Sequence, residues 1–330
     1  MQRRLLFAIF AGLIVASGNS GAASTAQTPD TPADYPNKTI RFITGFLPGG
    51  VSDTIARVLG EKLGEHLGQR VIIDGRPGAG GLISMELTAG ASPDGYTWFL
   101  GTPVVTISPS FKRKLPIDPA KALAAVTLIG TSPTILVASA NLPAASVKDL
   151  LALAKARPGG LRYASSGQGT TNHLAAELLR VTARVPLTHI PYKGAAATLF
   201  AVITGEVDIS FVPLLPAIPH VKSGKLTGIA VTGARRAQAL PNVPAIAETL
   251  TGYDVTSWYG LLVPAGTPPA LIQRLNVETN RVLDMAEVRE RLSAQGVEVQ
   301  GSTPGELTEL MRVDAARWAK LVKDAGILLE

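Results

Sequence analysis

The sequence predicts an α/β protein made of two lobes that face each other across a cleft, and three observations carry this prediction. Short runs of β-branched and aromatic residues alternate with runs of helical spacing, an order typical of parallel sheets covered by helices. A strand, a glycine-rich loop and a helix follow one another near residue 40 and again near residue 162. Two long apolar runs, 126–139 and 255–263, are candidates for strands that cross between the lobes.

The first of these units begins with a predicted strand over residues 39–44, where β-branched and aromatic side chains dominate. Gly45-Phe-Leu-Pro-Gly-Gly50 must interrupt it, because proline and paired glycines suit neither a strand nor a helix interior. Ser52 and Asp53 are predicted N-cap residues of a helix that runs to Leu67. Free N–H groups at such a helix start favour an anion. An ordinary turn without a ligand is the alternative.

The chain then repeats this order through the first half. Strands are predicted at 70–74 and 96–100, with a glycine loop at 75–81 and a helix at 82–89 between them. Thr102 follows the later strand. Because ligands bind beyond the carboxyl ends of parallel strands, we expect Thr102 to face the same crevice as the first glycine loop.

The second half opens with a helix over 146–157 and a short strand over 162–164. The loop from Ser165 to Asn172 is rich in glycine and hydroxyl groups and leads into a helix at 173–179. Further strands and helices alternate to the end of the chain. The predicted strands are 187–190, 207–212 and 226–232, and the predicted helices end at 204, 222, 283, 294 and 325.

The N-terminus has the features of a secretory signal peptide. Gln2-Arg-Arg4 is basic, and the apolar run Leu5–Ala16 spans about twelve residues, too few to cross a bilayer. We therefore expect residues 1–26 to hold the signal peptide and the start of a leader. Residues 27–36 are predicted to continue that leader as a disordered segment, and the mature protein is predicted to be soluble and exported.

Composition narrows the function classes. The chain has no cysteine, which excludes disulfides, thiolate metal sites and cysteine nucleophiles. The net charge of +6 falls to about +4 when Arg3 and Arg4 leave with the signal peptide. The one tight basic cluster, Lys112-Arg-Lys114, is interpreted as a solvated loop rather than a nucleic-acid contact. The remaining excess favours an anionic small ligand.

The motifs do not match known catalytic or nucleotide sites. Gly78-Ala-Gly80 is followed by Ile83 where a dinucleotide loop needs glycine or alanine, and no Gly-Lys-Ser/Thr closes a phosphate loop. Ser166 lacks the first glycine of a nucleophile elbow. No two histidines stand at metal-ligand spacing. His173 is predicted either to contact the first turn of its helix or to pack near the loop.

Six motifs in a fixed order carry a resemblance to a known family. The clearest is Phe46-Leu-Pro-Gly-Gly-Val-Ser-Asp-Thr-Ile-Ala-Arg57. The others lie at 76–81, 93–97, 189–194, 224–232 and 258–268. Together they resemble the Bug family, the solute receptors of tripartite tricarboxylate transporters, and the resemblance covers nearly the whole mature chain.

The resemblance implies a type II periplasmic binding protein with two α/β lobes, two crossover strands and a ligand cleft between them. We expect lobe 1 to comprise 37–135 plus 258–330, and lobe 2 to comprise 136–257. The implied function is a periplasmic receptor that captures a small carboxylate for membrane transporter subunits. For a receptor of this kind we expect no catalysis and no cofactor, metal or nucleic acid. We expect the protein to be a monomer. Two alternatives stay open: a ligand-sensing partner of a membrane signalling kinase, and a carboxylate-ester or amide hydrolase.

In the family the first loop, 46–53 here, holds one carboxylate through backbone amides and waters. The loop from Ser166 to Thr170 holds the distal end of the ligand. The predicted ligand-binding residues, all in loops at the carboxyl ends of strands or next to them, are Phe46, Leu47, Gly49, Gly50, Asp53, Thr102, Ser166, Gly169, Thr170, Tyr192, Lys193, Gly194 and Pro213.

The chain departs from the family pattern at a position that bears on the ligand. Where the family often has a polar pair such as Asp-Asn after the strand phenylalanine, this chain has Val212-Pro213. A buried amino group without an acceptor is costly, so this change favours a carboxylate without an amino group. Phe46, Tyr192, Trp258 and Pro213 are candidate apolar walls. Structural packing is the alternative for each of them.

Overall fold

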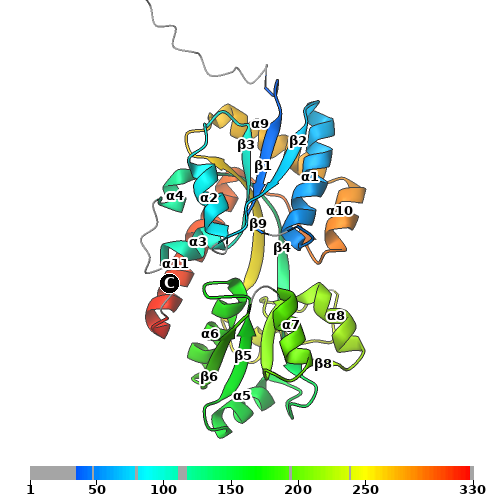
Figure 1. The fold of residues 1–330 in the computed structure, drawn as a ribbon, viewed down its shortest axis with the longest axis vertical. Helices are drawn as coiled ribbons and strands as arrows, with labels where there is room; N and C mark the ends of the chain where they lie inside the picture. Colours follow the sequence, from blue (N-terminus) through cyan, green and yellow to red (C-terminus); the bar gives the residue numbers. More distant parts are fainter. Residues whose placement is uncertain are drawn as a thin grey trace, which may run out of the picture.

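The computed structural model describes residues 35–46, 48–78, 81–110, 117–192, 195–237 and 239–327. Two groups of strands and helices, joined by two long strands, form the two lobes that Figure 1 shows one above the other. The predicted signal peptide, most of the leader and the Lys112–Lys114 cluster lie outside the described residues. Among the described residues, no helix combines the length and apolar character needed to cross a membrane.

Strands β1 to β3 form the first lobe's sheet and strands β5 to β8 belong to the second. The strands of the first lobe are β1 (Ile40–Thr44), β2 (Val71–Gly75) and β3 (Thr97–Gly101). Those of the second are β5 (Leu161–Ser165), β6 (Leu187–Pro191), β7 (Ile209–Pro213) and β8 (Leu226–Val231). The connecting strands are β4 (Leu123–Ser139) and β9 (Thr256–Pro264), and β10 (Glu298–Val299) pairs with β4.

Helices cover both faces of each sheet. The first lobe carries α1 (Val51–Leu67), α2 (Leu82–Ala89), α3 (Val104–Ile107), α4 (Pro119–Ala122), α9 (Pro269–Leu283) and α10 (Ala286–Ser293). The second lobe carries α5 (Val147–Ala156), α6 (Thr171–Ala183), α7 (Ala195–Ile203) and α8 (Leu214–Lys222). The C-terminal helix α11 (Pro304–Ala325) runs from the first lobe toward the second (Figure 1).

The two crossover strands give the sheet a mixed topology, with the order β2-β1-β3-β9-β4-β7-β5-β6. β1 is parallel to β2 and β3, and β5 is parallel to β6 and β7. β9 runs antiparallel to β3 and β4, and β4 runs antiparallel to β7. The predicted parallel sheet is therefore found within each lobe but is wrong at the centre. There the chain passes to the second lobe along β4 and returns to the first along the neighbouring β9, so these two strands are antiparallel.

This topology points both sets of strand ends at the waist of the molecule. β4 runs in the direction of β1 and β3, because β9 opposes both β3 and β4. β5 runs against β4, because β7 is parallel to β5 and antiparallel to β4. The carboxyl ends of β1 and β5 therefore face each other from opposite sides of the crossing.

Helix α11 joins the cores of the two lobes. Near its start, Leu307 is buried among first-lobe residues such as Phe99 and Leu262. Toward its end, Trp318 is fully buried among second-lobe residues such as Tyr163. The lobe boundaries given above stay a prediction, but a single helix contributes to both cores.

Candidate functional site

The first loop, residues 45–50, connects β1 to α1; Leu47 lies outside the described residues. Gly45 packs closely against the start of α2: a Cβ there would lie 2.8 Å from the Cα of Gly81 and 2.7 Å from Ser84 Oγ. Gly49 has a φ of +88°, a backbone conformation that residues other than glycine rarely adopt. Gly50, in an extended conformation, is the N-cap residue of α1. The glycines thus allow the chain to turn sharply and start a helix next to its neighbour.

The prediction that Ser52 and Asp53 cap α1 is wrong, because both lie inside its first turn. The Asp53 carboxylate instead accepts hydrogen bonds from the Gly49 N–H at 3.0 Å and from Arg57 Nε at 2.8 Å. The bond from Arg57 lowers the pKa of this carboxyl, and the Gly49 N–H adds to the effect. Asp53 therefore holds its own loop in place, and its charge is matched by Arg57.

Two other first-lobe loops gather beside the first loop. The Cβ that Gly81 lacks would lie 4.0 Å from the ring of Phe46, a side chain that is 38% exposed. Thr102 is buried directly after β3, where its carbonyl accepts the N–H of Val105. The structure thus brings the loops after β1 and β3 and the start of α2 to one end of the first sheet.

The second loop, residues 165–170, connects β5 to α6. Gly167 and Gly169 have φ values of +131° and +71°. Thr170 occupies the N-cap position, but its side chain does not cap the helix. Its hydroxyl lies 2.6 Å from the Gly167 carbonyl and 2.5 Å from Asn172 Oδ1. Ser166 Oγ donates to the same Asn172 oxygen at 3.0 Å. Asn172, which we did not predict from the sequence, therefore organises both hydroxyls.

The first turns of α1 and α6 leave backbone donors for a ligand. The earliest helical N–H bonds are from Thr54 to Gly50 O and from Leu174 to Thr170 O, both 3.0 Å long. The N–H groups of 51–53 and 171–173 precede them, and groups at these positions have no partner within the helix. Such helix ends also carry a partial positive charge. The two ends lie at the facing carboxyl ends of β1 and β5.

Two further predicted residues of the second lobe, Tyr192 and Pro213, lie near this loop and at the crossing. Tyr192 follows β6, and its N–H donates to Ser165 O at 2.8 Å. Pro213 ends β7 opposite Thr134 of β4. Lys193 and Gly194 lie outside the described residues, like Leu47. Trp258 is not a wall of this site: it is 2% exposed, and its Nε1 donates to Asp314.

Beneath the second loop lies a stack of three rings, from Tyr163 on β5, His173 on α6 and His189 on β6. The imidazole centroids are 4.2 Å apart, and Tyr163 lies 4.9 Å from His189. Burial, followed by the neighbouring His189, lowers the pKa of His173 to about 4. Burial also lowers the pKa of His189. Of the two roles predicted for His173, the structure confirms packing near the loop: the ring is buried and accepts the N–H of Gly169, a loop residue before α6.

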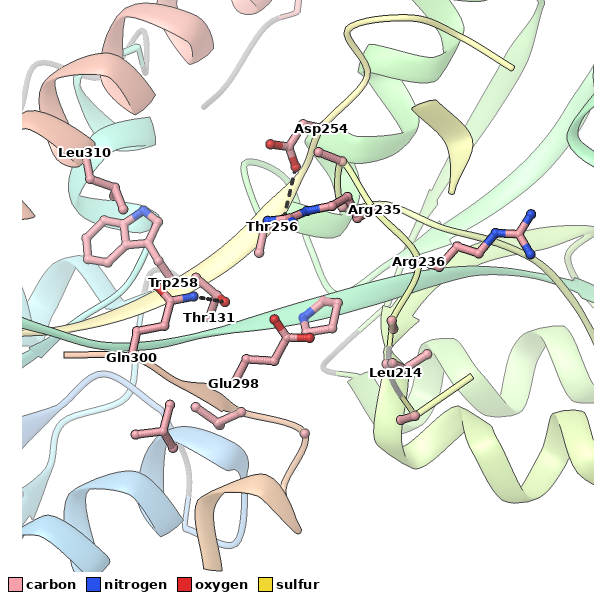
Figure 2. A pocket seen from close by; sticks show the side chains of 18 of the residues that line it. Thr131, Leu214, Arg235, Arg236, Asp254, Thr256, Trp258, Glu298, Gln300 and Leu310 are labelled. Carbon is pink, nitrogen blue, oxygen red and sulfur yellow. Dashed lines mark hydrogen bonds between the residues drawn. The ribbon is translucent and has the colours of Figure 1, made fainter. Parts of the chain in front are cut away.

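A separate pocket of about 1230 Å³ lies beside the crossover strands. Figure 2 shows part of its lining. The labelled residues include Thr131 of β4, Thr256 of β9, Glu298 of β10, Leu310 of α11, and Arg235 in the segment after β8. Among its lining residues, only Trp258 was singled out from the sequence. Among the described residues, no cluster of three or more histidine, aspartate or glutamate side chains could hold a metal ion.

The two-lobed fold and the two helix N-termini that face each other are features of the class of two-lobed solute-binding proteins. A profile described as "Tripartite tricarboxylate transporter family receptor" matches residues 55–327. The chain belongs to this family, and the match confirms the predicted resemblance. Protein BugT of Bordetella pertussis is 32% identical over 332 residues, covering 99% of each chain. A protein encoded in the tcbD-tcbE intergenic region of Pseudomonas sp. strain P51 is 33% identical over 93% of each chain.

Solved structures agree with this assignment. The structure titled R. palustris Rpa4515 with adipate matches with a TM-score of 0.81 and 34% identity, covering 89% of this chain and 99% of that one. MatC of Rhodopseudomonas palustris with bound malate matches with a TM-score of 0.74 and 29% identity, covering 87% and 100%. The periplasmic binding protein BugD gives 0.78 and 29%, covering 89% and 99%. The chain is therefore a solute-binding receptor with the two-lobed fold predicted from its sequence.

Proposed function

We propose that this receptor works in the periplasm, where it captures a small dicarboxylate without an amino group and passes it to the membrane subunits of a tripartite tricarboxylate-type transporter. The observation that supports this most is the pair of helix N-termini, α1 and α6, at facing ends of the two lobes. Membership of the receptor family supports binding rather than chemistry.

Each helix end offers what one carboxylate needs. The backbone N–H groups of 51–53 and 171–173 supply donors, and the helix dipoles favour negative charge there. Asp53 would repel an anion if its charge were unmatched, but Arg57 and the Gly49 N–H hold its carboxylate. A ligand with carboxylates at both ends would therefore meet one donor group on each lobe, and closure of the lobes would bring both to it.

The absence of an amino group from the ligand is inferred from the acids near the site. Val212 and Pro213 supply no side-chain acceptor at the end of β7. Asp208 precedes β7 and so lies at its opposite end, where it accepts hydrogen bonds from Arg157 and from the N–H of Arg162. Asp53 is engaged by Arg57. Adipate and malate, which relatives of 34% and 29% identity bind, both lack an amino group.

Isothermal titration calorimetry with matched ligand pairs tests the proposal. The pairs are succinate with aspartate, glutarate with glutamate, and adipate with 2-aminoadipate. We expect the dicarboxylate without the amino group to bind more tightly in each pair. Tighter binding of the amino acids across the pairs would overturn the ligand class. NMR spectra of the recovered ligand should show no conversion, and product formation would favour the hydrolase instead.

A variant of the second loop tests the site itself. Replacing Thr170 by valine removes the hydroxyl that orders the loop through Gly167 and Asn172. A lost neutral hydrogen bond costs about 0.5–1.5 kcal/mol, so we expect roughly 2- to 10-fold weaker binding. The control is Thr204→Val at the end of α7, where the hydroxyl donates only to helix carbonyls. Equal affinity of both variants would argue against a ligand at this loop.

A further inference from the structure

The stacked histidines described above bond directly to the second loop. His173 Nδ1 accepts the N–H of Gly169 at 3.1 Å, so this nitrogen carries no proton and the ring proton is on Nε2. His189 Nε2 lies 2.6 Å from Ser165 Oγ. That hydroxyl donates to Gly167 O at 3.0 Å and accepts the N–H of Gly167 at 3.1 Å, so His189 Nε2 is the donor to Ser165. The two glycine N–H groups of the loop are therefore both tied, directly or through one serine, to an imidazole.

The surroundings favour neutral rings. His173 is only 5% exposed, and its ring lies nearly parallel to that of His189, with 23° between the planes. The charged or titratable groups that face the pair are Tyr163 on β5 and Glu177 and Arg180 on α6. Glu177 is already engaged, accepting from the Tyr163 hydroxyl at 2.7 Å and from Arg180 at 2.7 Å. The nearest carboxylate is thus matched before either imidazole takes up a proton.

Protonation would act on the loop as well as on the stack. A proton on His173 Nδ1 turns an acceptor into a donor that meets the N–H of Gly169, so that hydrogen bond is lost. The new charge would also lie in a buried site against a second imidazole, which is unfavourable. The loop would then lose the contact that fixes Gly169 in its left-handed conformation.

We propose that His173 and His189 are positioning residues that hold the second loop in its ligand-binding conformation, and that protonation of His173 releases the loop and weakens binding in acid. The inference rests on the proposed function only in treating residues 165–170 as a ligand loop. Neither histidine touches the ligand in this scheme, and both act through Ser165, Gly167 and Gly169.

The size of the effect follows from the two states of the loop. A histidine freed from the stack titrates near its ordinary value of 6.5, whereas His173 in the stack titrates near 4. Lowering the pH from 8 to 5 therefore raises the ratio of released to held loop by about 30-fold. The affinity of the wild-type protein should fall by up to that factor, beyond any loss due to protonation of the ligand itself.

The binding experiment compares the wild type with His173→Asn, using adipate and calorimetry between pH 8 and pH 5. Asparagine places an oxygen near the position of Nδ1 and does not titrate, so we expect near wild-type affinity at pH 8 and a flatter pH profile. His66→Asn on α1 is the matched control and should keep the wild-type profile. Identical profiles for the wild type and His173→Asn would overturn the proposal. If His173→Asn does not fold, His173→Gln, which also supplies a side-chain oxygen that does not titrate, is judged by the same criterion.

A second measurement needs no ligand. In ¹⁵N NMR spectra of the ligand-free protein, the amide signals of Gly167 and Gly169 should shift together with the titration of His173, below pH 6 and before unfolding. Amide signals that stay fixed until the protein unfolds would overturn the proposal. If no carboxylate binds at any pH, the proposed function fails, and the NMR titration alone decides whether the histidines hold the loop.

Discussion

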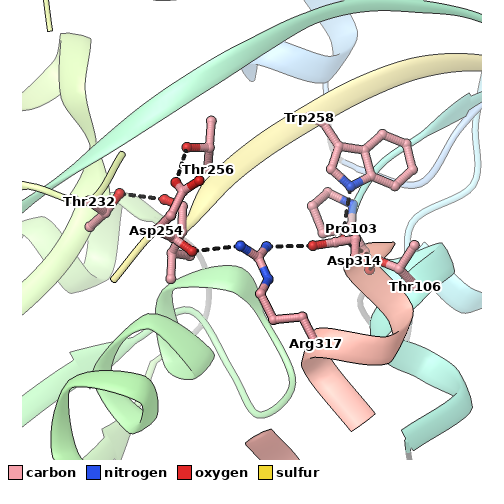
Figure 3. A network of polar contacts seen from close by, with 9 residues as sticks. Pro103, Thr106, Thr232, Asp254, Thr256, Trp258, Asp314 and Arg317 are labelled. Atoms are coloured by element: carbon pink, nitrogen blue, oxygen red, sulfur yellow. Dashed lines mark hydrogen bonds and ion pairs between the residues drawn. The ribbon is translucent and has the colours of Figure 1, made fainter. Parts of the chain in front are cut away.

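Replacing Asp314 with asparagine should reduce the free energy of unfolding, because this carboxylate joins three parts of the chain (Figure 3). Asp314 lies on α11 and is 6% exposed. Its Oδ2 accepts from Thr106 Oγ1 at 2.6 Å and from Trp258 Nε1 at 3.1 Å, and its Oδ1 accepts from Arg317 at 2.5 Å. Arg317 also donates to the carbonyl of Asp254 at 2.7 Å.

The magnitude follows from what asparagine can still accept. Its single oxygen can serve Thr106 and Trp258 or Arg317, but not both sides, and its amide then faces another donor. Loss of a hydrogen bond between charged groups costs about 1.5–3 kcal/mol, with more for a buried partner left unmatched. Because the side chain of Arg317 is 35% exposed, water compensates in part, and we expect a loss of about 2–3 kcal/mol.

Urea unfolding followed by circular dichroism measures this loss. The control is Asp284→Asn, which removes an ion pair with Arg289 in which Asp284 is 76% exposed, and should cost less than about 0.5 kcal/mol. Tryptophan fluorescence should report the same midpoint, because α11 packs into both cores and couples their unfolding. Equal costs for the two variants would refute the reasoning, and separate midpoints would refute the coupling.

Three further predictions concern backbone conformation, acid stability and closure. Gly160→Ala should cost about 3–5 kcal/mol, because at its φ of +73° the new Cβ would lie 1.9 Å from Pro186 O; Gly159→Ala, also at positive φ but in open space, should cost about 1 kcal/mol in the same urea assay. The pKa of His173 is about 6.5 in the unfolded chain and about 4 in the folded protein. The free energy of unfolding should therefore fall by about 3 kcal/mol as the pH is lowered from about 6.5 to about 4. Urea titrations of His173→Asn should lack this loss, and an equal loss would contradict it. Saturating adipate should reduce the radius of gyration in X-ray scattering, and superimposable curves would argue against hinge closure.

Local patterns allowed the strand-loop-helix units to be predicted from the sequence, because strand composition, glycine and helical spacing are all read over a few residues. The predicted N-cap of α1 was wrong because an aspartate near a helix start can accept hydrogen bonds from several different donors. Asp53 uses its oxygens for Gly49 and Arg57. The two-residue strand β10 has no pattern of its own and exists only through its pairing with β4.

Contacts between distant residues explain what the sequence did not predict at the site. Trp258 looked suitable as a ligand wall, but its role depends on Asp314, which lies on another element. The histidine stack depends on the register of β5 and β6, which places Tyr163 opposite His189. No spacing rule in a single sequence predicts that register, so the position of His173 near the loop was predicted but its stacking with His189 and Tyr163 was not.

The long pairing of β4 with β9 has a consequence for the order in which the protein is made. Leu123 pairs with Pro264 and Pro133 with Thr256, so the second lobe is inserted between the two strands. The first sheet needs β9 between β3 and β4, and the second core needs Trp318 of α11. During synthesis, neither lobe can be completed until the C-terminal part of the chain has emerged. Because contacts so far apart in sequence form slowly, we expect both lobes to complete their folding only late, after most of the chain has been made.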